Sequence, residues 1–169
     1  RLLAYSTVAQ LSYVIMAAAI LKPLAEIGAS IHMVAHAFGK ITLFFVAGAI
    51  YTASKKTEIG QLAGIGRRMP WTMTAFTIGA LSMIGVPPTA GFVSKWFILA
   101  GAFQADNYFA IFTIITSTVL NAAYFLPIVF IVWFGRETEG AGPDHGEAPL
   151  PIIIALTTTA ALTILFFLF

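Results

Sequence analysis

The chain alternates between long apolar stretches and short polar interruptions, and most of the apolar stretches are long enough to cross a membrane. A helix needs roughly 20 predominantly apolar residues to cross a hydrocarbon core about 30 Å thick. Complete crossings are therefore predicted at residues 2–21, 29–51, 69–86 and 150–169. Segments 92–103 and 108–134 are predicted to form one further, broken helix, because 92–103 covers only about 18 Å and cannot cross alone. A short re-entrant hairpin at 92–103 is the alternative.

Polar and turn-forming residues indicate where these elements end. Lys22-Pro23 is expected to end the first helix, because proline cannot continue a helix and restricts the residue before it. The second helix is expected to open at Gly28 or Ser30. Residues 52–68 carry most of the charged side chains in the first half of the chain and are predicted to form a water-exposed loop.

A second polar loop is predicted at residues 135–149, which are rich in glycine, proline and acidic side chains. Asp144, His145 and Glu147 are residue types that bind metal ions, but the composition around them favours a plain exposed loop. No metal site is predicted.

The composition identifies a membrane protein, since 59% of the residues are hydrophobic, 9% are charged and the mean hydropathy is +0.92. A formal charge of +2, scattered among apolar stretches, does not suggest a nucleic-acid surface. The absence of cysteine excludes thiolate-held iron–sulfur clusters, Cys-ligated zinc and disulfides within this sequence, and no cofactor is predicted. The sequence opens at Arg1 without the pattern of a signal peptide, so we expect an internal fragment of a larger protein.

One apolar stretch contains three polar side chains at regular spacing. His32, His36 and Lys40 are four residues apart, and on a helix each step advances only about 40° around the axis, so the three share a face. Lys40 lies at the middle of segment 29–51, where a lysine costs roughly 2.5–3.5 kcal/mol on insertion scales. Lysine held away from water gives up its proton more readily, and imidazole titrates near neutral pH. The stripe is therefore predicted to store and relay protons.

Other interpretations of the two histidines remain open. They would have a structural role if they only formed hydrogen bonds to a neighbouring helix. A single haem could not take both, because His32 and His36 leave the same helix face. On the first helix, Ser6, Gln10 and Tyr13 also recur at helical spacing, and they are predicted to face protein and to form hydrogen bonds between helices.

Three segments of this sequence resemble the antiporter-like membrane family, which includes large subunits of Mrp-type Na⁺/H⁺ antiporters, proton-pumping membrane subunits of respiratory complex I and related membrane-bound hydrogenases. The segments are the His-Lys stripe, Gly85-Val-Pro-Pro-Thr-Ala-Gly-Phe-Val-Ser-Lys-Trp96 and the opening Arg1-Leu-Leu-Ala-Tyr-Ser-Thr-Val-Ala-Gln10. The resemblance implies an all-α polytopic membrane helix bundle of five transmembrane elements with one broken helix. It also implies that residues 1–169 are one half of an inverted-repeat fold, the second five-helix repeat of a larger subunit.

The resemblance implies a function and partners. The expected function is translocation of protons, or of protons and a cation such as Na⁺, through a multi-pass subunit of the cell (inner) membrane. The expected partners are the missing first repeat, other membrane subunits of a hetero-oligomeric complex, and the lipid bilayer. The sequence from Met69-Pro-Trp-Thr-Met73 to Ser94-Lys-Trp96 is most like the Mrp D subunit, and so is Gly39, where complex I members more often have a bulky residue. The alternatives are a proton-pumping subunit of an NADH:quinone oxidoreductase or membrane-bound hydrogenase, and a structural membrane anchor. No redox chemistry is expected in this chain.

The second motif adds Lys95 to the predicted proton path. Lys95 would lie within the first two turns of a helix that begins near Gly91, where the positive end of the helix dipole opposes a cation. It is predicted to hand protons between Lys40 and the far side. Many complex I relatives have an acid next to this lysine, where this chain has Trp96. Asp106 is a weaker candidate for proton transfer and is expected to cap the following helix.

The distribution of basic residues predicts an orientation. With the broken helix crossing once, a single side would carry Arg1, Lys55, Lys56, Arg67, Arg68 and Arg136. Lys22 would lie on the opposite side. By the positive-inside rule, the richer side is predicted to be cytoplasmic.

Overall fold

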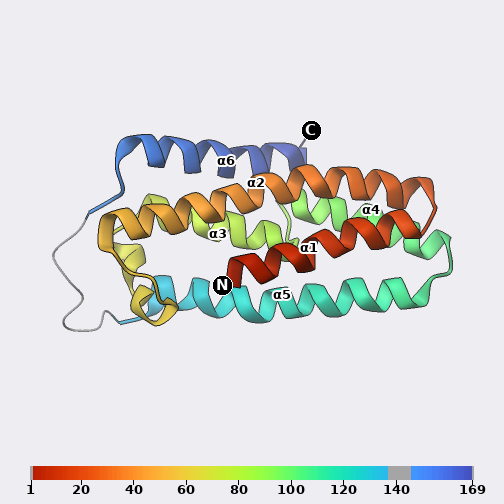
Figure 1. The fold of residues 1–169 in the computed structure, drawn as a ribbon, viewed down its shortest axis with the longest axis horizontal. Helices are drawn as coiled ribbons and strands as arrows, with labels where there is room; N and C mark the ends of the chain where they lie inside the picture. Colours follow the sequence, from red (N-terminus) through yellow and green to blue (C-terminus); the bar gives the residue numbers. More distant parts are fainter. Residues whose placement is uncertain (1, 137–145, 169) are drawn as a thin grey trace.

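A computed structural model describes residues 2–136 and 146–168, and it shows a bundle of long helices lying side by side (Figure 1). The helices are α1 (Leu2–Ala19), α2 (Pro23–Ser54), α3 (Pro70–Ile84), α4 (Ala90–Gln104), α5 (Tyr108–Phe134) and α6 (Leu150–Leu168). Two short 3₁₀ helices, η1 (Ile59–Leu62) and η2 (Ile65–Arg67), lie between α2 and α3. The predicted all-α membrane fold is confirmed.

Within the described residues, the helices α1, α2, α5 and α6 are long and apolar enough to cross a membrane. Helices α3 and α4 have 15 residues each and extend about 22 Å, which is too short for a crossing by either one. The number of five crossings stays a prediction.

Helices α3 and α4 follow each other in the same direction along the single long helix α2 (Figure 1). At one end of α2, Gly28 packs against Ile98 of α4. Further along α2, Gly39 packs against Met83 near the end of α3. The last turns of α2 belong to the same hydrophobic cluster as Met73 of α3. Helix α2 therefore runs antiparallel to α3 and α4, which together form the broken helix.

The break in this helix lies at residues 85–89, and the predicted break at 104–107 is wrong. Gly85 ends α3 with a φ of +88°, and the two prolines that follow cannot donate main-chain hydrogen bonds. At residues 104–107 the chain reverses instead, and Asp106 takes a φ of +49°. Helix α5 then runs back along α4 and α3, as shown by the hydrogen bond from Trp133 Nε1 to Thr77 Oγ1 at 3.0 Å.

The structure differs from the prediction in two further places, the start of α2 and the loop that follows it. Helix α2 begins at Pro23 rather than at Gly28 or Ser30, because proline fits the first turn of a helix, where its missing N–H is not needed. The loop after α2 is only partly exposed to water. It contains η1 and η2, and Ile65 of η2 is fully buried in a cluster with α2, α3 and α5.

The loops that carry the basic residues lie at the ends of the bundle that the sequence predicted. The α2–α3 connection and the C-terminal end of α5 gather at one end of the bundle, and the α1–α2 and α4–α5 connections gather at the other (Figure 1). Moving the break therefore leaves Lys22 at the end of the bundle opposite Lys55, Lys56, Arg67, Arg68 and Arg136. Arg1 lies outside the described residues.

The loop before α6 is attached to the start of α3 through Glu147. Its two carboxylate oxygens accept hydrogen bonds from Trp71 N and Thr72 Oγ1, both at 2.7 Å. These donors lie in the first turn of α3, where main-chain N–H groups lack helical partners and the dipole favours an anion. Asp144 and His145, the other two residues considered as metal ligands, lie outside the described residues.

Candidate functional site

The three polar side chains of α1 that recur at helical spacing face the interior of the bundle, as predicted. Ser6, Gln10 and Tyr13 are all buried. Gln10 Nε2 donates a hydrogen bond to Met83 O on α3 at 3.1 Å, and the Tyr13 hydroxyl is hydrogen-bonded to Ser117 Oγ on α5. The prediction of hydrogen bonds between helices is confirmed.

The His-Lys stripe of α2 is buried along its whole length. His32, His36 and Lys40 expose only 2%, 7% and 4% of their surface, in a helix with many lipid-facing positions. The two imidazole rings are stacked, with centroids 6.2 Å apart and planes inclined by 19°. The structure thus brings the three side chains together on one inward face, and their role in proton transfer stays a prediction.

Lys40 lies at the level of the break in the α3–α4 helix. Its Nζ donates a hydrogen bond to Leu3 O in the first turn of α1, at 2.9 Å. The neighbouring Gly39 is in close contact with Ser82 and Met83, in the last turn of α3. A Cβ built at position 39 lies 2.6 Å from Met83 Cε, so a larger residue there would require the end of the Met83 side chain to shift. The glycine that the sequence singled out therefore lies in close contact with the last turn of α3.

Lys95 lies inside the break itself. It is the sixth residue of α4, and its Nζ reaches back to donate hydrogen bonds to Met83 O at 3.1 Å and Ile84 O at 2.8 Å. Its Nζ also lies over the ring of Tyr13, 5.1 Å from the centroid. The expected position in the first two turns of α4 is correct.

Two helix ends act on the charge of Lys95, and the sequence indicated only one of them. The N-terminus of α4 does oppose a cation, but the bonded carbonyl groups form the C-terminal end of α3, where the helix dipole favours one. The two helix ends therefore act in opposite directions on Lys95. Sequence reasoning missed the second because it placed the break after α4 rather than before it.

His32 connects the stripe to the neighbourhood of Lys95. Its Nδ1 lies 2.9 Å from Ser94 Oγ, and the Ser94 hydroxyl is also 3.0 Å from Gly91 O. A hydroxyl has one proton, and a carbonyl can only accept, so Ser94 donates to Gly91 and accepts from His32 Nδ1–H. The Nε2 of a neutral His32 is then an open acceptor for a proton. Ser94 belongs to the Gly85–Trp96 motif and stands directly before Lys95, but the sequence predicted no role in proton transfer for it.

Four buried polar atoms around these residues have no hydrogen-bond partner within the described part of the chain: Gln10 Oε1, His32 Nε2, His36 Nε2 and Ser82 Oγ. A buried polar atom without a partner costs about 1–3 kcal/mol. All four belong to α1, α2 and the last turn of α3, the elements that hold Lys40 and Lys95. These four atoms are available as hydrogen-bonding partners for water that enters the region.

Asp106 is separate from this cluster. It is exposed in the reversal between α4 and α5, eleven positions after Lys95, which corresponds to about 16 Å along a helix. The cap of α5 is formed by Asn107, whose side chain accepts a hydrogen bond from Ala110 N at 3.1 Å. The expectation that Asp106 caps α5 is wrong, because Asp106 adopts the left-handed conformation of the turn.

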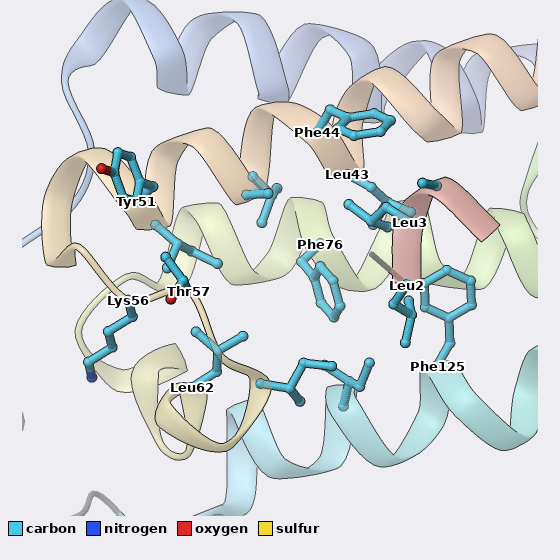
Figure 2. A pocket seen from close by; sticks show the side chains of 16 residues that line it. Leu2, Leu3, Leu43, Phe44, Tyr51, Lys56, Thr57, Leu62, Phe76 and Phe125 are labelled. Carbon is cyan, nitrogen blue, oxygen red and sulfur yellow. The ribbon is translucent and has the colours of Figure 1, made fainter. Parts of the chain in front are cut away.

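An apolar groove of about 470 Å³ lies between the start of α1, the second half of α2, α3 and α5 (Figure 2). Lys56 and Thr57 lie at one end of the groove, and Leu2 and Leu3 at the other. Its walls are mostly aliphatic and aromatic, and neither histidine of the stripe lines it. The groove is thus distinct from the polar cluster, although the carbonyl of Leu3 binds Lys40.

Residues 1–121 match the transmembrane family described as NADH:quinone oxidoreductase/Mrp antiporter. The chain belongs to this family. The resemblance seen in the three sequence motifs is therefore confirmed, and with it a multi-pass membrane protein.

Relatives in this family come from both kinds of complex. The chain is 40% identical over 152 residues to the N subunit of the NADH-quinone oxidoreductase of Desulforudis audaxviator, covering 89% of this chain and 30% of the relative. It is 36% identical over 154 residues to the L subunit of the Rickettsia conorii enzyme, covering 90% and 23%. It is 30% identical over 162 residues to the D subunit of the Na(+)/H(+) antiporter of Alkalihalophilus pseudofirmus, covering 93% and 33%. The chain spans about a third or less of these relatives.

Solved structures show the same fold. The membrane-bound sulfane sulfur reductase, an archaeal respiratory membrane complex, contains a chain with a TM-score of 0.88 and 29% identity, covering 96% of this chain and 27% of that one. The Mrp complex from Dietzia sp. also gives a TM-score of 0.88, at 22% identity, covering 98% and 39%. The fold is therefore that of membrane subunits in multisubunit complexes.

Proposed function

We propose that this chain carries protons, or protons in exchange for a cation such as Na⁺, as part of a membrane subunit in a multisubunit complex. The observation that carries this proposal is the buried stripe of Lys40, His36 and His32, which continues through Ser94 to the surroundings of Lys95. Four ionisable side chains in the interior of a membrane bundle are costly, and a structural role alone gives no reason to keep them there.

The line supports a stepwise transfer. Lys40 acts as the store in the middle of α2, and each imidazole can take up a proton at one nitrogen and release one from the other. The Nε2 atoms of both histidines lack partners among the described residues, so bound water can bridge them to the lysines. Lys95 then serves as the transfer site towards the end of the bundle formed by the α4–α5 reversal.

Two kinds of complex fit this mechanism. The interpretation as an Mrp D subunit rests on the sequence from Met69–Met73 to Ser94–Trp96 and on Gly39. A proton-pumping subunit of an NADH:quinone oxidoreductase is the second candidate, favoured by the 40% and 36% identities to the N and L subunits. In both cases we propose that a preceding repeat of the same subunit and other membrane subunits complete the pathway, and that any redox chemistry takes place outside this chain.

The test is proton flux into liposomes that contain the complete complex. Flux driven by an imposed Na⁺ gradient supports the Mrp interpretation, and flux that requires a quinone and its reductant supports the oxidoreductase interpretation. In either complex, Lys40→Ala and Lys95→Ala are expected to abolish flux while the complex still assembles. Normal flux in both assembled variants would contradict the relay and leave the role of a structural anchor.

A further inference from the structure

Tyr13 of α1 lies between His32 and Lys95 of the proposed relay. Its side chain is buried, with 3% of its surface exposed. The ring faces Lys95 Nζ at 5.1 Å from its centroid and makes an edge contact with His32, with centroids 5.4 Å apart and an interplanar angle of 65°. One aromatic ring therefore contacts titratable side chains from both α2 and α4.

A chain of hydrogen bonds from α5 holds this ring. The Tyr13 hydroxyl is bonded to Ser117 Oγ and lies 3.4 Å from Asn121 Nδ2. Asn121 Oδ1 lies 2.6 Å from the Tyr124 hydroxyl, which is also 2.9 Å from Ser6 Oγ on α1. Two residues of α1 are thus linked to three residues of α5 through their side chains.

The directions of these bonds follow from the available protons. An amide oxygen only accepts, so the Tyr124 hydroxyl donates to Asn121 Oδ1 and accepts from Ser6. The Asn121 amide donates to the Tyr13 oxygen, which leaves the Tyr13 proton for Ser117. Ser117 in turn donates to Thr113 O at 2.7 Å, so Tyr13, Ser117, Asn121 and Tyr124 each donate one hydrogen bond and accept another. Such a connected network fixes the orientation of its side chains.

Few charged or titratable side chains surround Lys95, so the Tyr13 ring is the main side chain in contact with its ammonium group. Helices α3 and α6 contain no titratable side chain, and α4 contributes none besides Lys95. From α1 and α2 the titratable neighbours are Tyr13 and His32, and the tyrosines of α5 are Tyr108 and Tyr124. The described residues provide no carboxylate partner for Lys95, so its ammonium group is held by two carbonyl oxygens and the Tyr13 ring.

We propose that Tyr13 is a positioning residue for Lys95: its ring face attracts the protonated amine at the helix break, and the hydrogen-bond chain from α5 holds that face in place. The role sets how easily Lys95 gains and loses its proton during transport. It rests on the proposed function, because it affects transport only if Lys95 carries the transported proton.

The first experiment varies the electron density of the ring without changing its size. The complete complex is prepared with Tyr13→Phe and with phenylalanine analogues bearing one, two or three ring fluorines at position 13, and proton flux is measured against pH. Tyr13→Phe is the baseline, since it lacks the hydroxyl throughout. Each fluorine weakens the attraction of the ring for a cation, so the flux profile is expected to move stepwise towards acid pH, by about one pH unit in total. A profile that stays fixed across the series overturns the proposal.

The second experiment tests the anchor of the ring. Asn121→Leu removes the bond to the Tyr13 hydroxyl but leaves the ring, and it is expected to shift the profile in the same direction by a smaller amount. Tyr108→Leu is the matched control, because Tyr108 lies on the same helix with 73% of its surface exposed and should cause no shift. If Asn121→Leu and Tyr108→Leu give the same profile, the anchoring role of α5 is wrong.

Lys95→Ala separates this proposal from the proposed function. Normal flux in assembled Lys95→Ala complex overturns the relay itself. Loss of flux in Lys95→Ala, together with an unchanged profile in the fluorinated series, overturns the role of Tyr13 and leaves the relay intact.

Discussion

Lys95 of α4 donates a hydrogen bond from Nζ to the carbonyl oxygen of Ile84, the last residue of α3, across a distance of 2.8 Å. With the second bond to Met83 O, this contact joins the two halves of the broken helix through a side chain. A protonated amine and a neutral amine both have enough N–H groups for two such bonds. The side chain can therefore lose a proton without leaving its partners, which suits a transfer site.

The first prediction concerns the charge of Lys95. Lys95→Arg should lower proton flux nearly as much as Lys95→Ala, by at least about tenfold, because a guanidinium group stays protonated. Flux into liposomes at constant complex content measures the effect. Normal flux with arginine would show that a fixed positive charge is sufficient and that Lys95 does not carry the proton.

The second prediction concerns Lys40. Lys40→Ala should reduce flux to the background of empty liposomes while the complex still assembles, because a buried charge is removed and Leu3 O retains its bond from Thr7 Oγ1 at 2.9 Å. Lys22→Ala, directly before the start of α2, is the control and should transport normally. Assembly is checked by the subunits that copurify. Undiminished flux in Lys40→Ala would remove the central store from the mechanism.

The third prediction separates the two histidines. His32→Ala should reduce flux more than His36→Ala, because His32 is also bonded to Ser94 and contacts the Tyr13 ring, next to Lys95. Bound water can replace one relay group, so each single variant should retain part of the flux. The double variant should retain the least. Normal flux in both single variants and in the double variant would mean that His32 and His36 only pack between helices.

The fourth prediction tests the close packing at the break. Gly91→Ala should destabilise the assembled complex, because a Cβ at this position would lie 1.9 Å from Ser82 O, and main-chain atoms cannot move aside cheaply. A fall of roughly 5 °C or more in the unfolding temperature is expected. Gly48→Ala on α2, where nothing lies within 4 Å, should be neutral or stabilising by up to about 1 kcal/mol. Equal unfolding temperatures for the two variants would contradict the close contact.

Much of the fold could be predicted from the sequence, because apolar length and polar spacing directly reflect the membrane environment. The inward face of α1 and the shared face of His32, His36 and Lys40 followed from helical periodicity alone. The position of the break did not, because Gln104–Asn107 and Gly85–Thr89 both interrupt helices, and deciding which one reverses the chain requires the packing against α2. The partners of Lys95 were missed for a related reason: main-chain carbonyl groups have no sequence signature.

The continuous helix α2 has a mechanical consequence for the broken helix beside it. Gly28 of α2 packs against α4 and Gly39 of α2 packs against α3, so α2 bridges the gap between the two halves. A change in the angle between the two halves would alter the packing of α2 between these two contacts. That segment of α2 carries His32 and His36, so any opening of the gap would change the stacking of the two imidazole rings.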